Sequence, residues 1–336
     1  MALKCIGISY AFFSVLGIVV NAKIIQTIHR YKKFRRKFTN LILMHMSMTH
    51  LLACTFLLPV YAIFLLFNSW IQINTVVCDV MGSFSCGLTL LSLGAITALN
   101  IDKYKAITQP LKHSPYVTKL RLGVFVSTVW ILAVALVVTA NFTGQHFHYD
   151  IFLGGCSFNF RPQTGSNIPS VALLCATFVL PTSILLVCYC RIFTIARTHR
   201  RHIVGLLHKV ASDAQQVAVT SRLRRQSSFV DDYAAAGDRK AVGSILLVLG
   251  SYVLLYLPFG AVCIYGAVMR EQPREVTLLV ASLLFRAHPL VNALVYGFHN
   301  KIFTVKCCVA RLKKLRRRLQ RRQETIHRVE TASFEL

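Results

Sequence analysis

The sequence predicts an all-α membrane protein in which seven transmembrane helices form a bundle. Three observations support this fold class. Of 336 residues, 55% are hydrophobic and only 15% are charged, and the mean hydropathy is +0.55, which does not fit a soluble domain of this length. Seven apolar stretches are each long enough to cross roughly 30 Å of hydrocarbon as a helix. The segments between and after them carry most of the positive charge.

The seven stretches form one domain, residues 1–299, and a basic tail follows at 300–336. As helices, they satisfy their own backbone hydrogen bonds, which lipid requires. We see no strand pattern and no internal repeat. The predicted spans are Cys5–Ile28, Leu41–Phe67, Cys78–Ile101, Leu122–Ala140, Val171–Ile195, Val242–Val268 and Val276–Phe298.

The distribution of lysine and arginine predicts the orientation of the bundle. Segments 29–40, 102–121, 191–240 and 299–336 hold 32 of the 38 cationic residues. By the positive-inside rule these segments are cytoplasmic, so we expect a multi-pass plasma-membrane protein with an extracellular N-terminus. The net charge of +26 is then explained by topology and by attraction to acidic inner-leaflet lipids, and it is no argument for nucleic-acid binding.

Polar and proline residues recur at regular places along the spans. Asp102, Lys103 and Tyr104 end the third span, and Asn292 and Tyr296 stand four residues apart near the end of the seventh. In order and spacing, the set resembles the helix markers of rhodopsin-like G-protein-coupled receptors, as a divergent, orphan-type member. The other members of the set are Asn21, Trp130, Pro181, Tyr189 and Pro258.

The resemblance implies further features at both ends of the bundle. Cys78 and Cys156, both on the oxidising outer side, match the disulfide that ties the third helix to the second outer loop. Phe303 and the pair Cys307 and Cys308 resemble a short amphipathic eighth helix with palmitoylation sites. A heterotrimeric G protein is the implied partner, with arrestin as a further candidate.

The switch region departs from the family pattern. Lys103 replaces the family's arginine, and a flexible lysine cannot reproduce the planar fork of arginine. We expect Lys103 to pair loosely with Asp102 and with Asp238, which stands twenty residues before Pro258, and Tyr189 to meet the helix-three cation in the active state. Raised basal activity and weak coupling both remain open.

The sixth and seventh spans depart from the pattern too. Tyr256 takes the place of the family's tryptophan toggle, and Ala293 replaces the proline after Asn292. The seventh helix should therefore kink less at that point, unless Pro289 supplies a bend instead.

His50 stands where the family has its sodium-binding aspartate, so sodium regulation is doubtful. We predict a polar cluster between helices one, two, three and seven. It serves either as hydrogen-bonded glue between helices or, through its two histidines, as a proton-sensitive switch. Its members are Asn21, His50, Ser92, His288 and Asn292.

The ligand pocket is defined mainly by exclusion. Ser85 replaces the aspartate of amine receptors, and Arg286 replaces the retinal-linking lysine of opsins, so both ligand classes are disfavoured. Arg286 is also a charge at membrane depth with no acid inside the spans. It either binds an anionic small molecule or lipid, or it reaches backbone carbonyls, Tyr265, Asp79 or Glu275. The candidate pocket residues are Ser85, Cys86, Thr89, Tyr256 and Arg286.

Short motifs predict modifications and accessory partners. Asn141 opens a glycosylation sequon, and Ser227 follows two arginines in a pattern resembling basophilic kinase sites. The stretch 310–322 combines a leucine stripe with many cations, typical of binding to acidic lipids or calmodulin. The terminal residues Phe334 to Leu336 resemble a PDZ-binding end.

We find no arrangement of residues that indicates catalysis. The sequence therefore predicts a receptor that signals an unknown extracellular stimulus, or its own constitutive activity, to heterotrimeric G proteins. The alternative is a non-signalling seven-helix membrane partner or scaffold that modulates other receptors.

Overall fold

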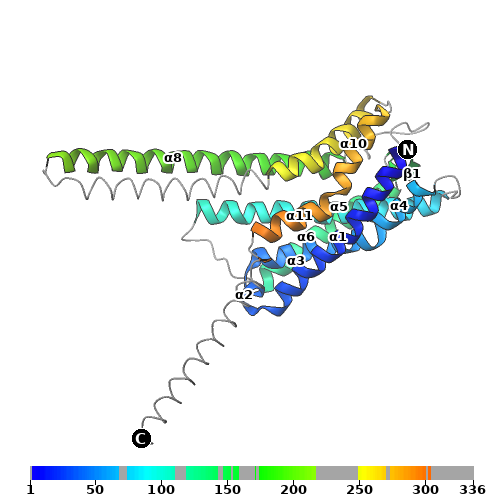
Figure 1. Ribbon diagram of the computed structural model, residues 1–336, viewed down its shortest axis with the longest axis horizontal. Coiled ribbons are helices and arrows are strands. Elements are labelled where there is room, and N and C mark those ends of the chain that lie inside the picture. The colour runs from blue at the N-terminus through cyan, green and yellow to red at the C-terminus, as the bar shows by residue number, and fades with distance from the viewer. Residues whose placement is uncertain are drawn as a thin grey trace, which may run out of the picture.

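The computed structural model describes residues 2–67, 74–109, 119–142, 147–152, 154–158, 171, 174–216, 249–269, 273–299 and 302–303. Six helices in these ranges are long and apolar enough to cross a membrane, and a bent helix pair adds a seventh span. The seven-helix prediction is thereby confirmed (Figure 1).

Helices cover the predicted spans in the described residues, and α8 continues beyond the predicted end at Ile195 to Gln216. The first span is α1 (Ala2–Arg30), and the short α2 (Lys32–Arg35) follows it. The second span combines α3 (Phe38–Leu52), a π-helical turn (Ala53–Leu57) and α4 (Leu58–Leu66). The third and fourth are α5 (Thr75–Thr108) and α6 (Lys119–Phe142). The fifth combines a π-helical turn (Cys175–Val179) with α8 (Leu180–Gln216). The sixth is Leu249–Met269, and the seventh combines α10 (Glu275–Arg286) with α11 (His288–His299).

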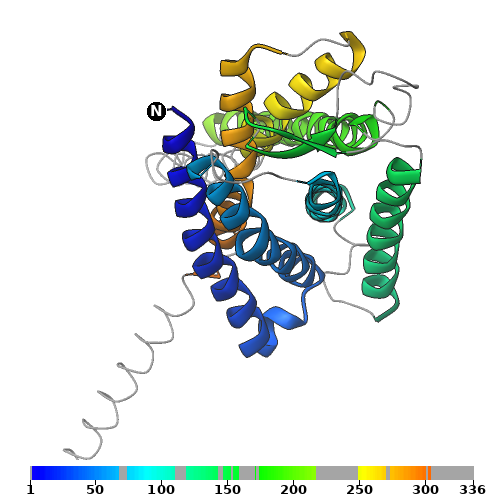
Figure 2. The same ribbon diagram turned by 90° about the vertical axis from the view of Figure 1, so that its right-hand side faces the viewer.

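The third span, α5, is central to the bundle. Figure 2 shows it almost end-on, with α1 on one side and α6 on the other. A core cluster joins α5 to the second, fifth, sixth and seventh spans, and a smaller one joins it to α1 and α4. Such a central position lets residues of α5 contact most other helices.

Both π-helical turns precede a proline. Pro59 lies two residues after the turn that ends at Leu57, and Pro181 lies two residues after the turn that ends at Val179. Proline lacks the backbone N–H and its ring clashes with the carbonyl four residues earlier, so the extra residue of a π-turn relieves both problems.

The seventh span bends by 41° between α10 and α11. Pro289 lies at the start of α11 and cannot donate to the Phe285 carbonyl. The Nδ1 atom of His288 takes that place, 2.6 Å from the Phe285 oxygen. The sequence offered Pro289 as an alternative place for a bend, and the break between α10 and α11 lies beside it.

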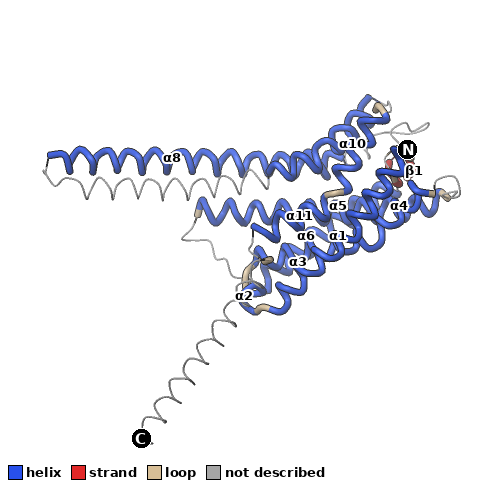
Figure 3. The backbone as a smooth tube through the Cα atoms, in the orientation of Figure 1, coloured by secondary structure: helices blue, strands red, loops and turns tan. Residues whose placement is uncertain are grey.

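A short β-hairpin, for which the sequence shows no pattern, covers one end of the bundle. Strand β1 (Phe147–Asp150) pairs antiparallel with β2 (Gly155–Phe158), and Tyr149 lies opposite Cys156. Four-residue strands are too short to show a clear alternation of apolar and polar residues, which explains the omission. Figure 3 shows the two strands as the small red segment among blue helices.

The hairpin is fixed to α5 by three contacts. The predicted disulfide between Cys78 and Cys156 is confirmed. The backbone N–H of Phe147 donates to the Asp79 carboxylate at 2.7 Å, and the Phe147 ring packs directly on Gly82. We call this end of the bundle the disulfide end and the opposite one the Asp102 end.

Replacing Gly82 should loosen the hairpin, because a Cβ atom there would overlap the Phe147 ring. Overpacking of this kind costs about 1–3 kcal/mol. We expect Gly82→Ala to lower the thermal unfolding midpoint of the purified protein in detergent micelles.

Gly87→Ala is the matched control, since Gly87 lies on the same helix and nothing is within 4 Å of a Cβ atom there. Both changes gain the same roughly 0.5–1 kcal/mol of helix propensity. An unfolding midpoint for Gly82→Ala equal to or above that of Gly87→Ala would contradict the packing account.

Candidate functional site

A cavity of about 70 Å³ lies beneath the hairpin, between α5, the fifth and sixth spans and α10. We call it the hairpin cavity. Four of the five predicted pocket residues line it. These are Ser85, Cys86, Thr89 and Arg286, and they are joined by Gly82, Phe147, Cys156, Ser157, Leu174, Thr177, Phe178, Phe259, Cys263 and Phe285.

The fifth predicted pocket residue, Tyr256, lines neither the hairpin cavity nor the smaller cavity described below. It precedes Phe259 by three residues, so it lies about one turn deeper in the bundle. Its side chain is fully buried and faces polar groups instead of the hairpin cavity. The structure thus separates Tyr256 from the candidate pocket.

Arg286 brings a buried charge to the hairpin cavity. Its side chain is 7% exposed, and Nη1 donates to Ser85 Oγ at 3.1 Å. The guanidinium lies over the Tyr61 ring at 4.4 Å from its centre, and over Phe285 at 5.5 Å. Nε has no hydrogen-bond partner among the described residues.

Hydroxyl groups and aromatic rings surround Arg286. Tyr10 is another such neighbour, and its hydroxyl interacts with Arg286. Tyr265, which the sequence offered as one partner, is 47% exposed and makes no such contact. Asp79, another option, accepts from the Phe147 N–H. Within the described chain, Arg286 therefore forms no ion pair with a carboxylate.

Tyr149 lies on β1, outside the spans, and packs against Phe147 and Cys156, which line the hairpin cavity. Burial, with smaller contributions from Asp150 and Tyr10, raises the pKa of its phenol to about 12. The hydroxyl therefore stays protonated at physiological pH and offers no negative charge to the cavity.

A second, smaller cavity of about 20 Å³ is lined by Arg286 and Ser85. We call it the histidine cavity. Its polar lining residues are Thr49, His50, Ser85, Thr89, Arg286 and His288, and the rest of its lining consists of Ala53, Leu57, Leu58, Leu88 and Pro289. Both cavities share Ser85, Thr89 and Arg286.

Hydrogen bonds connect the histidine cavity to the centre of the bundle. Asn292 Nδ2 donates to the Tyr256 hydroxyl at 2.8 Å, which lies 3.3 Å from Ser92 Oγ. Ser92 Oγ in turn lies 2.8 Å from His50 Nε2. We call this series, from Asn292 through Tyr256 and Ser92 to His50, the polar chain.

The amide nitrogen of Asn292 can only donate, so the Tyr256 oxygen accepts there. Between Tyr256 and Ser92 either hydroxyl can be the donor, and we infer that Tyr256 donates because this direction uses its own proton. Ser92 then donates to Nε2 of His50. In neutral His50 the proton consequently sits on Nδ1, which has no partner in the described chain.

The structure places the other two cluster residues beside this chain. The His288 ring lies 5.4 Å from that of His50 and 5.0 Å from that of Tyr256. Asn21 donates to the Pro289 carbonyl at 3.1 Å and so ties α1 to the bend of the seventh span. All five predicted residues are buried.

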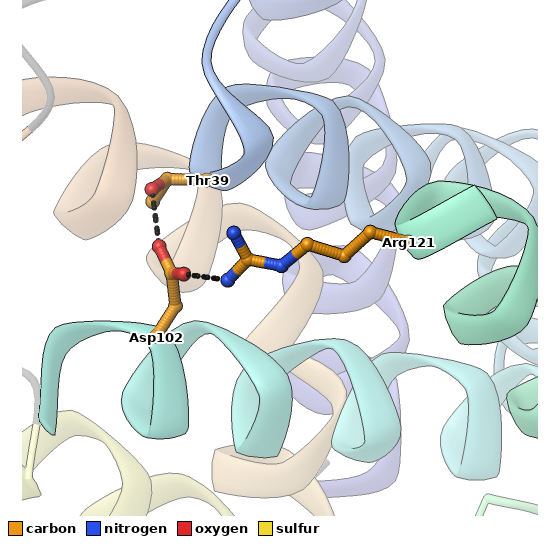
Figure 4. Close-up of polar contacts among 3 residues, drawn as sticks. All are labelled: Thr39, Asp102 and Arg121. Carbon is orange, nitrogen blue, oxygen red and sulfur yellow. Dashed lines mark hydrogen bonds and ion pairs between the residues drawn. The ribbon is translucent and has the colours of Figure 1, made fainter. Parts of the chain in front are cut away.

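Asp102 is held by two residues that the sequence analysis did not single out. Arg121 Nη2 and Asp102 Oδ1 are 2.7 Å apart, and Thr39 Oγ1 donates to Oδ2 at 2.7 Å (Figure 4). Arg121 also lies over the Phe38 ring at 4.0 Å. This contact joins α3, α5 and α6 at the Asp102 end.

The expected pairing of Lys103 with Asp102 is wrong. Lys103 projects elsewhere, with its ammonium 5.7 Å from the centre of the Tyr296 ring on α11. The guanidinium of Arg121 satisfies Asp102 with better geometry, because its planar fork suits a carboxylate. Asp238 lies outside the described residues.

Asn100 is a further residue that the sequence analysis missed. The Tyr189 hydroxyl donates to its Oδ1, and Nδ2 donates to the Ile96 carbonyl at 2.7 Å. Tyr296 also interacts with Asn100. An amide inside an otherwise apolar helical turn, two residues before Asp102, was the available signal.

The remaining predicted residues lie as follows. Tyr104 packs partly buried against the core, and Pro258 lies within the sixth helix. Asn141 falls in the last turn of α6 rather than just beyond it. The eighth helix, Ser227, Cys307, Cys308, stretch 310–322 and the terminal residues lie outside the described residues, except that Phe303 packs on the core and on Phe298.

Comparisons with known proteins agree with this geometry. The profile of the 7 transmembrane receptor (rhodopsin family) matches residues 20–296. The alpha-1A adrenergic receptor of Oryzias latipes is 22% identical over 320 residues, covering 89% of this chain and 64% of that receptor. The histamine H2 receptor of Canis lupus familiaris is 24% identical over 273 residues, covering 80% and 68%. This chain spans slightly less than two thirds of the first of these relatives.

A solved structure shows the same fold. The crystal structure of squid rhodopsin superposes with a TM-score of 0.66 at 17% identity, covering 88% of this chain and 81% of that one. The Gq-coupled rhodopsin of Mizuhopecten yessoensis is 21% identical over 315 residues, covering 90% of this chain and 60% of that protein.

Removing Arg121 should destabilise the Asp102 end, because it leaves a carboxylate that is only 5% exposed without its cation. We expect Arg121→Ala to lower the free energy of unfolding by about 1–3 kcal/mol, measured as a lower thermal unfolding midpoint. Arg35→Ala, which removes an exposed cation from α2, is the control and should have little effect. Equal midpoints for the two variants would show that the Arg121 contact contributes nothing.

Proposed function

This chain belongs to the rhodopsin family of seven-transmembrane receptors, and we propose that it signals an extracellular stimulus, or its own constitutive activity, to a heterotrimeric G protein. In this proposal the chain is a multi-pass plasma-membrane protein with its N-terminus outside. The disulfide end then faces the extracellular side, and the Asp102 end faces the G protein.

The polar chain is the observation that carries this proposal. It crosses from α3 through α5 and the sixth span to α11, and it starts at a cavity that shares Arg286 with the hairpin cavity. Tyr296 follows Asn292 by one turn and contacts Lys103. A displacement of the sixth span would break the Tyr256 contacts and change the environment of both tyrosine and lysine at the Asp102 end.

The position of Lys103 favours raised basal activity over lost coupling. Asp102 is occupied by Arg121 and Thr39, so it does not restrain Lys103 in a resting state. The contact between Lys103 and Tyr296 is a cation–π interaction, worth about 0.5–2 kcal/mol. A restraint this weak supports frequent entry into the active state.

The hairpin cavity is the proposed site of the stimulus. Two of the relatives are named for adrenergic and histamine receptors, yet Ser85 stands where amine receptors carry their aspartate, and no described acid pairs with Arg286. The buried guanidinium favours an anionic small molecule or an acidic lipid. A cluster of phenylalanines, including Phe178, Phe259 and Phe285, favours an apolar body on that ligand.

Other partners remain predictions. We propose that the basic tail binds acidic inner-leaflet lipids, and that arrestin, calmodulin and a PDZ protein are candidate cytoplasmic partners. The non-signalling partner or scaffold is the less favoured function, because the polar chain and the contact between Tyr189 and Asn100 support the proposed switch.

A dose series tests the central proposal. With raised basal activity, second-messenger output in cells should change with surface expression in the absence of ligand, in the direction set by the coupled G-protein class. The measurement is messenger concentration against surface abundance for each G-protein class. A flat response in every class, at verified surface expression, would favour the non-signalling partner.

A second experiment tests the role of Lys103. Lys103→Arg offers a planar fork near Tyr296, Tyr189 and the G protein, while Asp102 already has its arginine. We expect G-protein activation to rise about fivefold, the effect of one further hydrogen bond worth about 1 kcal/mol. The readout is nucleotide exchange on purified G protein.

Lys105→Arg is the matched control, since Lys105 is exposed on the same helix two residues later. Exchange rates for Lys103→Arg no higher than those for Lys105→Arg, at equal receptor concentration, would remove lysine as the factor that limits coupling.

A further inference from the structure

We propose that the histidine cavity binds a small inorganic anion of the size of chloride. The cavity lies at the position of His50, where the family resemblance places a sodium-binding aspartate. None of its lining residues is an aspartate or a glutamate. The proposal goes beyond the signalling function and depends on no step of it.

Two unpaired donors belong to residues that line this cavity. Arg286 Nε carries a proton and has no partner in the described chain. The direction of the polar chain puts the proton of neutral His50 on Nδ1, which is also without a partner there. Buried donors without acceptors are costly, so each of the two favours a nearby acceptor.

Ser85 supplies a third donor. Its oxygen accepts from Arg286 Nη1, which leaves its own proton available. The two threonines differ, because Thr49 donates to the Met46 carbonyl and Thr89 to the Ser85 carbonyl. His288 commits its Nδ1 proton to the Phe285 carbonyl. The donors toward the anion are therefore Arg286, His50 and Ser85.

Charge distinguishes an anion from a water molecule at this site. Arg286 is buried at membrane depth, and none of the described carboxylates forms an ion pair with it. A bound anion would neutralise the guanidinium from inside the bundle, which a water molecule cannot do.

Size limits the anion. The cavity of about 20 Å³ exceeds the roughly 10–15 Å³ that one water molecule needs. It admits one small ion and excludes a carboxylate ligand with an organic body. Chloride is the abundant ion that meets both the size and the charge requirements.

The test measures thermal unfolding of the purified full-length protein in four salts at equal ionic strength. Sodium chloride, choline chloride, sodium gluconate and choline gluconate separate the effect of the anion from that of sodium. We expect both chloride salts to raise the unfolding midpoint by about 3 °C over both gluconate salts, because a ligand that binds the folded state stabilises it.

Variants localise the effect. His50→Asp should abolish the chloride effect, because a carboxylate at that position neutralises Arg286 internally, and Arg286→Gln should abolish it by removing the charge. Arg121→Gln is the control, because Arg121 lines neither cavity, and it should keep the full shift. His50→Asp keeps the test decisive where Arg286→Gln fails to fold.

Three results would overturn the proposal. Equal midpoints in chloride and gluconate would mean that no small anion is bound. A shift that follows sodium rather than chloride would indicate a sodium site. A chloride shift that persists in His50→Asp would place the anion elsewhere, such as on the basic surface. None of these results depends on G-protein coupling, so each is separable from failure of the proposed function.

Discussion

Inside the spans, backbone polar groups must find their partners within the protein, because lipid offers none. The structure meets this requirement even where proline removes a donor. A π-helical turn precedes Pro59 and Pro181, and His288 bonds to the carbonyl that Pro289 leaves free. The bend of the seventh span therefore follows from the missing N–H of Pro289 and from the bond of His288 that replaces it.

A similar requirement for partners explains the two arginine sites, of which Arg121 is partly exposed and Arg286 is buried. At the Asp102 end, Arg121 meets a carboxylate and a nearby hydroxyl group completes the site. Near the disulfide end, Arg286 meets a hydroxyl group and two aromatic rings. One site is closed by internal charge pairing, and the other has a positive charge that the described residues leave without an ion pair. The second is therefore the natural place for ligand chemistry.

The switch region differs from the sequence expectation through a competition between two cations. Asp102 pairs with Arg121 through Nη2 at 2.7 Å and accepts from Thr39 at its other oxygen, so both carboxylate oxygens are occupied. Lys103 is then directed to Tyr296, while Asn100 bonds to Tyr189. The third span thus contacts Tyr189 through Asn100, and Tyr296 through both Lys103 and Asn100.

The sequence by itself determined the seven spans and the residues of the polar cluster, and its resemblance to a known family gave the disulfide. Span length, charge distribution and the presence of a polar group in an apolar stretch are local properties, so they can be read without a structure. The short hairpin lacked any such local signal. The bent seventh span had one in Pro289.

Only the tertiary structure decided which partner each polar residue takes. Asp102 meets Arg121 across 19 residues of sequence, and Ser92 meets Tyr256 across 164. Tyr256 belongs to the polar chain and not to the predicted pocket. Asn100 bonds to Tyr189 and Thr39 to Asp102, and the sequence alone did not predict these contacts. Such pairings depend on where helices cross and how each is rotated. Those quantities are set by packing against all neighbours together, and no single stretch of sequence contains them.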